Sequence, residues 1–287
     1  MRLSMKLNDT KRNLCKTTFL AFILLSVSIL AMPCKTECAT FAVRISPPNF
    51  ELKGKPGDIL REIITIENAD TAPGIYQVRT ADWDLNKQGG VVIHPPDKPL
   101  AASSCRPWTR IERRTFKLLP KRIKRYRFEV HIPGDAQDGE SRFAVVISPA
   151  PETIDAMKFG SFNVPVAGAI AVVVYVTVGK AKPELEFKGV VKKKANGKTS
   201  LMVNLHNWGN AHARPSGSVI AKDAGGKKAE LLLSPFPILP GKTRGISLFA
   251  DKEISGIENI EELIFPLYLK GLIEWDGGTY KVDTMIE

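Results

Sequence analysis

The chain has 287 residues, of which 44% are hydrophobic and 25% charged, and its formal net charge is +11. This composition supplies one or two ordinary hydrophobic cores, and it excludes both a disordered chain and a polytopic membrane protein. Glycine (22) and proline (20) together make about 15% of the residues, above the usual ~12%, which favours turns over long helices. Only four cysteines are present, three of them among the first 38 residues, so a disulfide scaffold is not available.

The N-terminus has the pattern of a secretory signal. Five basic residues precede Phe19–Ala31, an uncharged apolar run of 13 residues that is too short to span a ~30 Å hydrocarbon core as a helix. We predict a signal peptide at 1–39, cleaved near 39 to 42, and an exported protein that is periplasmic, with association with the cell surface as the alternative. The alternative is an uncleaved anchor, because the small-residue cleavage site is poorly formed. Cleavage leaves no stable membrane span and a net charge of +7, since 1–39 carries six Lys or Arg and two Asp or Glu.

From residue 41 onward, apolar and polar residues alternate with a period of two between turn signals, as in the strands of a β-sandwich. The clearest case is 122–132, where aromatic and aliphatic side chains share one face and charged ones the other. The strands predicted in this half of the chain are 58–68, 75–83, 122–132 and 141–148. The charge-free segment Val164–Val178 follows, and we interpret it as one long strand with a bend near 165–168.

Polarity rises sharply at 179–183, which predicts a domain boundary there. Beyond it, turns such as Asp276-Gly-Gly278 separate further predicted strands. These are expected at 184–192, 200–206, 216–222, 230–233, 244–249, 264–274 and 279–284, with a helical turn at 257–263. The predicted fold class is all-β, with two immunoglobulin-like β-sandwich domains, at 40–179 and 180–287, behind the signal peptide.

The polar residues form no recognisable catalytic or metal-binding motif. The four histidines are scattered without zinc-ligand spacing, no serine lies in a nucleophile elbow, and no glycine-rich phosphate loop precedes a helix. The sequence therefore predicts no enzyme, no cofactor and no metal, and it predicts surface or turn roles for His206 and His212. Cys105 is the single cysteine left after cleavage. It is predicted to be either buried and inert or exposed to unwanted thiol reactions.

Ten Lys or Arg residues lie between Arg106 and Arg127, interleaved with aromatic residues. This pattern is compatible with a groove for nucleic acid. Export removes the chain from nucleic acid, however, so we expect a solvated basic face whose partners are acidic surface polymers or an acidic protein. The residues predicted to form this face are Arg122, Lys124, Arg125 and Arg127.

The segment Val164–Val178 allows two interpretations. A strand buried on both faces gives such an uncharged, β-branched pattern. The alternative is a strand at the rim of its domain, whose apolar row and free backbone groups pair with a partner chain.

Several segments together resemble the periplasmic pilus chaperones of the chaperone-usher pathway. They are 41–52 (Phe-Ala-Val-Arg-Ile-Ser-Pro-Pro-Asn-Phe-Glu-Leu), 63–68, 93–96, 142–149 and 169–178. The resemblance covers about 140 residues of the first domain, and the second domain only by size and β content. It implies two immunoglobulin-like domains, and a last strand of the first domain that lends apolar side chains to an incomplete pilin-like subunit. The positions implied for this contact are Val164, Val166, Ile170, Val172, Val174 and Val176.

The same resemblance implies a cationic cleft, which this sequence lacks at the matching positions. The family holds the subunit's C-terminal carboxylate with an Arg and a Lys, and the corresponding positions here fall near Pro47 or Pro48 and near Ala171. Arg44, a few residues away, takes this role only if the register differs.

Two functions follow as hypotheses. The first is a non-enzymatic assembly factor that caps a pilin-like client by strand addition along 164–178, with an outer-membrane usher as a further partner; it predicts an exposed apolar row there. The second is a structural or adhesive envelope module that binds acidic polymers through its basic face; it predicts that the strand is fully covered.

Overall fold

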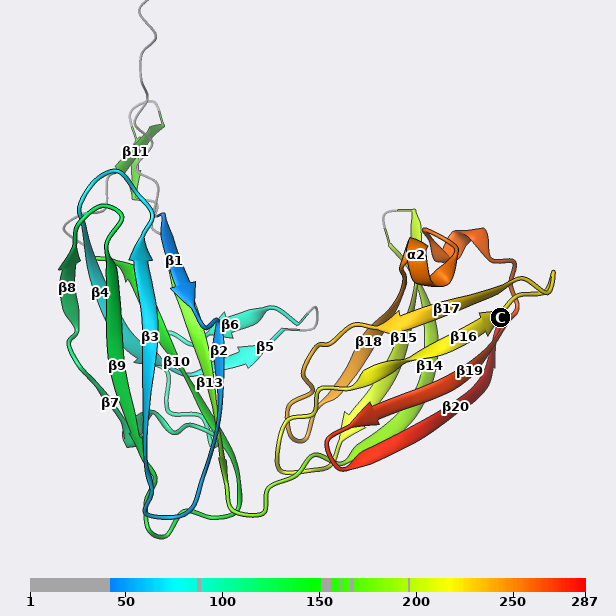
Figure 1. The fold of residues 1–287 in the computed structure, drawn as a ribbon, viewed down its shortest axis with the longest axis horizontal. Helices are drawn as coiled ribbons and strands as arrows, with labels where there is room; N and C mark the ends of the chain where they lie inside the picture. Colours follow the sequence, from blue (N-terminus) through cyan, green and yellow to red (C-terminus); the bar gives the residue numbers. More distant parts are fainter. Residues whose placement is uncertain (1–41, 87–88, 151–155, 160–161, 166–167, 196) are drawn as a thin grey trace, which may run out of the picture. The chain divides into compact units, whose positions relative to one another are not determined.

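The computed structural model describes residues 42–287 except 87–88, 151–155, 160–161, 166–167 and 196. The predicted signal peptide and Val166 therefore lie outside the described residues. The described chain consists mainly of strands, with a few short helical turns (Figure 1), so the all-β prediction is confirmed. None of the helices within these residues has the length and apolar character needed to cross a membrane.

The first half of the chain forms two sheets around one hydrophobic core. The four-stranded sheet has the order β1-β3-β9-β7 and the five-stranded sheet the order β2-β13-β10-β4-β8. Their strands are β1 (Val43–Ser46), β2 (Asn49–Gly54), β3 (Ile59–Asn68), β4 (Gly74–Ala81), β7 (Thr109–Ile111), β8 (Thr115–Leu118), β9 (Ile123–His131), β10 (Gly139–Pro149) and β13 (Ile170–Val178). Two hairpins lie outside both sheets: β5 (Trp83–Leu85) with β6 (Val91–Ile93), and β11 (Ala156–Phe159) with β12 (Phe162–Pro165). The 3-10 turn η1 spans Arg106–Trp108.

Strand β9 shows why the sequence pattern fixes this packing. Tyr126, Phe128 and Val130 are buried in the core, whereas Arg125 and Arg127 are exposed. Successive side chains of a strand point to opposite faces, so the alternation read from the sequence places one face inside and the other in water. Tyr126 completes the packing, because its hydroxyl donates a hydrogen bond to the carbonyl of Arg113.

The second half of the chain forms one seven-stranded antiparallel sheet around a second core. Its order is β14-β15-β18-β17-β16-β19-β20. Its edge strands approach each other, since Phe187 on β14 stacks on Tyr280 of β20 at 4.5 Å between ring centroids. The elements are β14 (Leu185–Ala195), β15 (Lys198–Asn207), β16 (Ser216–Lys222), β17 (Lys228–Leu233), β18 (Thr243–Ala250), α2 (Lys252–Ser255), η3 (Ile260–Glu262), β19 (Leu267–Trp275) and β20 (Gly278–Ile286). The division of the chain at 179/180 remains a prediction.

The prediction of one long strand over Val164–Val178 is wrong. Val164 belongs to β12, which pairs with β11, and β13 begins only at Ile170. Gly168 and Ala169 lie in no strand. Proline lacks the N–H that a continuous ladder needs and glycine weakens a strand interior, so Pro165 and Gly168 end the pairing rather than bend it.

Candidate functional site

The predicted partner-binding row is divided by the fold. Val172, Val174 and Val176 are fully buried in the first core, and the expectation that they form an exposed row is therefore wrong. The reason is the position of β13 inside its sheet. It pairs with β10 on one side, Gly139–Ile147 against Ile170–Val178, and with β2 on the other.

The opposite face of β13 is covered as well. Tyr175 is 2% exposed and packs edge-on against Trp83, with ring centroids 5.2 Å apart. The Trp83 indole N–H donates a 2.9 Å hydrogen bond to the carbonyl of Phe143. Val173 and Ala171 pack partly buried against the same cluster. From Val172 to Val178 the strand is thus buried on one face and buried or partly buried on the other, as its uncharged sequence favours.

The N-terminal end of β13 differs, because its backbone has a neighbour on one side only. Pairing with β2 begins at Asn49 opposite Val173. The residues before Asn49 leave this sheet, since β1 pairs with β3 in the four-stranded sheet. Within the described part of the chain, no strand lies beside Ile170–Val172 on that side. We call these three residues the β13 edge.

The β11–β12 hairpin (156–165) stands between β10 and β13 in the chain. Its register pairs Ala156 with Pro165 and Phe159 with Phe162, which places Val164 opposite Met157. Each strand of this hairpin has only the other as its neighbour among the described residues. The hairpin and the β13 edge therefore follow each other along the chain as two stretches with unpaired strand edges.

Arg44, the cation considered for a carboxylate cleft, already has a partner. Its guanidinium bonds the Glu67 carboxylate at 2.7 Å across the β1–β3 pair. This pair lies in the four-stranded sheet, whereas β13 belongs to the five-stranded sheet.

The predicted basic face is only partly a single surface. Arg125 and Arg127 are exposed on the outward face of β9, and Arg122 is exposed just before that strand. Lys124 has the other orientation. Its ammonium lies 3.1 Å from the Glu112 carboxylate and 5.5 Å from the centroid of the Phe116 ring. The hydrogen bond from Lys124 holds the pKa of Glu112 below its usual value.

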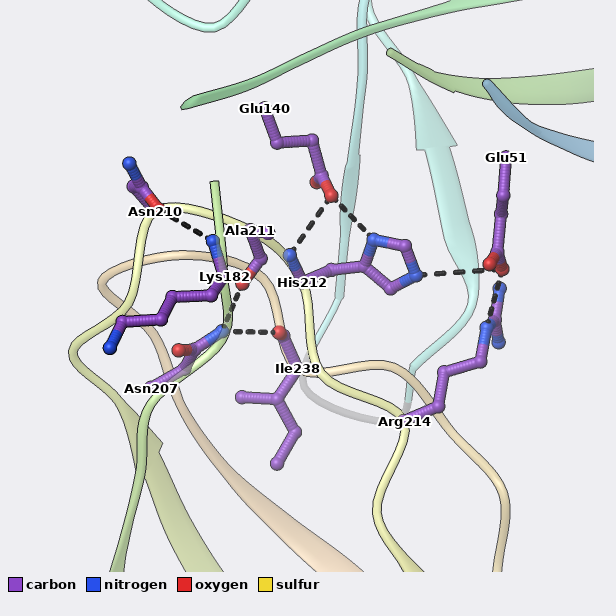
Figure 2. A network of polar contacts seen from close by, with 9 residues as sticks. All are labelled: Glu51, Glu140, Lys182, Asn207, Asn210, Ala211, His212, Arg214 and Ile238. Atoms are coloured by element: carbon purple, nitrogen blue, oxygen red, sulfur yellow. Dashed lines mark hydrogen bonds and ion pairs between the residues drawn. The ribbon is translucent and has the colours of Figure 1, made fainter. Parts of the chain in front are cut away.

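Sequence reasoning missed a polar network that joins β2 and β10 to the segment after β15 (Figure 2). The His212 side chain is only 9% exposed, and its Nδ1 lies 2.5 Å from the buried Glu140 carboxylate. Its ring stacks on Tyr175 with centroids 4.0 Å apart. Arg214 bonds Glu51 at 2.8 Å. His212 lies in the loop after β15, as the expected surface or turn role allows, but its ring is largely buried, and nothing in the spacing of these residues indicated the contact.

Burial would raise the pKa of Glu51, but the hydrogen bond from Arg214 and the nearby charges of His212 and Arg214 outweigh it. The pKa of this carboxyl therefore lies below its usual value. Glu51 on β2 lies opposite Tyr175 on β13 in the ladder. The contacts that His212 and Arg214 make with these two residues therefore hold β2 in its place beside β13.

Asn207, fully buried at the end of β15, holds the segment that carries His212 and Arg214. Its side-chain amide donates to the carbonyls of Ala211 and Ile238 at 2.8 and 2.9 Å (Figure 2). Its carbonyl oxygen accepts from the N–H of Gly209. Asn68 does the same at the end of β3, where it bonds the turn that follows. In both places a satisfied buried amide fixes a turn.

No group of three or more His, Cys, Asp or Glu suited to a metal ion occurs among the described residues. Cys105 is fully buried, and burial raises the pKa of its thiol, so the thiol is held in its unreactive form.

No family model and no curated protein matches the sequence. Solved structures similar to this chain over most of its length are pilus chaperones, the class that the sequence motifs resemble. They include the YadV chaperone (13% identity, TM-score 0.44, 85% of this chain and 99% of that one) and the class 5 fimbriae chaperone CfaA (12%, 0.43, 86% and 99%). A third is the SafB chaperone of Salmonella enterica in complex with SafA pilin (12%, 0.42, 86% and 97%). At these identities the likeness concerns the fold alone.

Proposed function

We propose that this protein is a periplasmic, non-enzymatic chaperone that holds an immunoglobulin-like client, such as a pilus or surface-structure subunit, by β-strand addition. The observation that carries the proposal is the β13 edge. An extended client segment would pair with Ile170–Val172 on the side that β2 leaves open, and would continue along the β11–β12 hairpin.

The chemistry of this region suits a strand partner. Each backbone hydrogen bond formed with a client contributes about 0.5–1.5 kcal/mol net, and apolar burial adds ~25 cal/mol per Å². No charged residue occurs from Phe159 to Gly179. Natural edge strands usually carry charges that prevent pairing with other chains. An uncharged edge promotes aggregation unless it serves to bind a partner strand.

The covered and uncovered parts of β13 favour different hypotheses. The burial of Val172–Val178 is what a structural module predicts, and it removes Val174 and Val176 from the client contact. The free edge at Ile170–Val172 and the hairpin before it favour the chaperone. The proposed contact is thus shorter and lies further toward the N-terminus than the resemblance implies. It comprises Val164 in the hairpin and the start of β13.

The test is co-expression with the products of neighbouring genes, followed by affinity capture from the envelope fraction and mass spectrometry. The variants are Ile170→Asp and Val164→Asp, each of which places a charge where a client strand would pair. Val92→Asp is the matched control, because Val92 is 44% exposed on β6, a strand that does not pair with β13.

We expect wild type and Val92→Asp to retain the same β-rich chain, and either edge variant to lose about tenfold or more of it, which corresponds to about 1.4 kcal/mol. All variants are checked by thermal unfolding, and Val164→Asp remains informative if Ile170→Asp does not fold. Equal retention by folded edge variants, or equal loss in the control, overturns the proposal.

A further inference from the structure

A second surface of the first sandwich carries a strong charge that strand addition does not use. It lies where β8 and β9 meet at one edge of the sandwich. The two strands belong to different sheets, and the buried rings of Phe116 on β8 and Tyr126 on β9 lie 5.9 Å apart between centroids, so the inner faces of these strands meet in the core next to this edge. Lys117 and Arg125 therefore point outward from different sheets, on either side of the edge. The exposed cations of this basic band are Arg113, Arg114, Lys117, Lys121, Arg122 and Arg125.

Most of these cations are not neutralised within the protein. Lys121 donates to the carbonyl of Ala69, but no ion pair or hydrogen bond engages the other five side chains among the described residues. Two nearby carboxylates are already occupied: Glu112 bonds Lys124, and Glu67 bonds Arg44. Asp70, beside Ala69 in the chain, accepts from the N–H of Thr71 and forms no ion pair among the described residues, so it is one carboxylate near the band that keeps its charge. A surface with so many free cations attracts anions over about a Debye length of ~8–10 Å.

The turn between β8 and β9 adds exposed apolar groups to this charge. Leu119 is 52% exposed and Ile123 is 61% exposed, and Lys121 and Arg122 lie between them. The end of β3 holds this turn in place, because the Arg122 carbonyl accepts from Asn68 N–H and Lys121 N–H donates to the Asn68 carbonyl. A rigid turn that presents apolar side chains among cations has the chemistry of an interfacial membrane contact.

We propose that the basic band docks the protein on an anionic lipid surface, with the cations against phosphate headgroups and Leu119 and Ile123 in the interfacial layer. A purely electrostatic site for a soluble polyanion needs no exposed apolar pair, and the two apolar side chains therefore favour a lipid. This contact uses β8 and β9, whereas the proposed client contact uses the β13 edge and the β11–β12 hairpin.

The test is co-sedimentation of the exported, processed protein with phosphatidylcholine vesicles that contain about 30% phosphatidylglycerol, and with phosphatidylcholine alone. One variant is Arg122→Glu/Arg125→Glu and a second is Leu119→Ser/Ile123→Ser. The matched control is Lys270→Glu/Lys281→Glu, which reverses two exposed charges on β19 and β20.

We expect binding to the anionic vesicles only. The arginine variant should lose about tenfold or more of it, because each basic residue near such a surface contributes about 1 kcal/mol. The apolar variant should lose a smaller but measurable part, and the control variant should bind as wild type. Absence of vesicle binding, or an equal loss in the control, overturns the proposal. An apolar variant that binds as wild type, together with equally tight binding of soluble polyphosphate, shows a polyanion site instead and also overturns it.

Discussion

Strands β13 and β20 have the same length, nine residues, but they differ in their charged residues and in the number of neighbouring strands. β20 lies at the edge of its sheet, and it carries Lys281 and Asp283 on the face that meets water. β13 contains no charge and has strands on both sides over most of its length. An uncharged strand thus needs protein on both edges and faces. The uncharged sequence continues before β13, where the described residues form the β11–β12 hairpin and no strand from either sheet pairs with it. This is the region that we assign to a client.

The largest effect should come from placing a charge in β13. Val174→Asp puts a carboxylate at a fully buried position, and we expect a loss of more than about 4 kcal/mol of the free energy of unfolding, enough to unfold the first sandwich. Met285→Asp makes a similar change on β20, where the side chain is 63% exposed, and should change stability by less than about 0.5 kcal/mol. Urea denaturation measures both. Similar costs at the two positions would contradict the burial difference between the strands.

A smaller effect is expected where each strand carries a tyrosine. Tyr175 on β13 contacts Trp83 and His212, and Tyr175→Ala should cost about 3–5 kcal/mol because it leaves a cavity. Tyr280 on β20 is partly exposed and stacks on Phe187 only, so Tyr280→Ala should cost about 1–2 kcal/mol. Thermal unfolding of the two variants gives the order directly, and a reversed order would be inconsistent with the packing described here.

The smallest effect concerns the pH dependence of the β2 attachment beside β13. The pKa of Glu51 is lower in the folded than in the unfolded protein, so its ion pair with Arg214 stabilises the fold above about pH 4.3. This contribution is lost as the pH falls through the lowered folded pKa. Because the pair is half-exposed, we expect Glu51→Gln to cost less than about 1 kcal/mol at neutral pH. The difference from wild type should vanish in acid. A difference that grows in acid would have the wrong sign.

The sequence predicted the parts of the fold that depend on local pattern. The alternation in β9 gave the correct buried face at Tyr126 and Phe128, and the turn before Leu263 was found as η3. The burial of β13 on both faces was one of the two interpretations that the uncharged pattern left open.

The parts that could not be predicted depend on long-range contacts. His212 meets Glu140, which is 72 residues away in the sequence, and no periodicity reports such a pair. The open side of the β13 edge arises because the chain before Asn49 changes sheets, a choice that the local sequence at Pro47 and Pro48 does not specify. The basic stretch was visible in the sequence. Its division into a paired Lys124 and an unpaired band across β8 and β9 required the structure.

The most direct test of the central claim is hydrogen–deuterium exchange on the free protein and on the complex copurified with its client. We expect the amides of β12 and of Ile170–Val172 that have no partner on β11 or β10 to exchange readily in the free protein and to become protected about tenfold or more in the complex, while amides in β20 do not change. Unchanged exchange at 162–172 in a complex that is otherwise intact would contradict strand addition at the β13 edge.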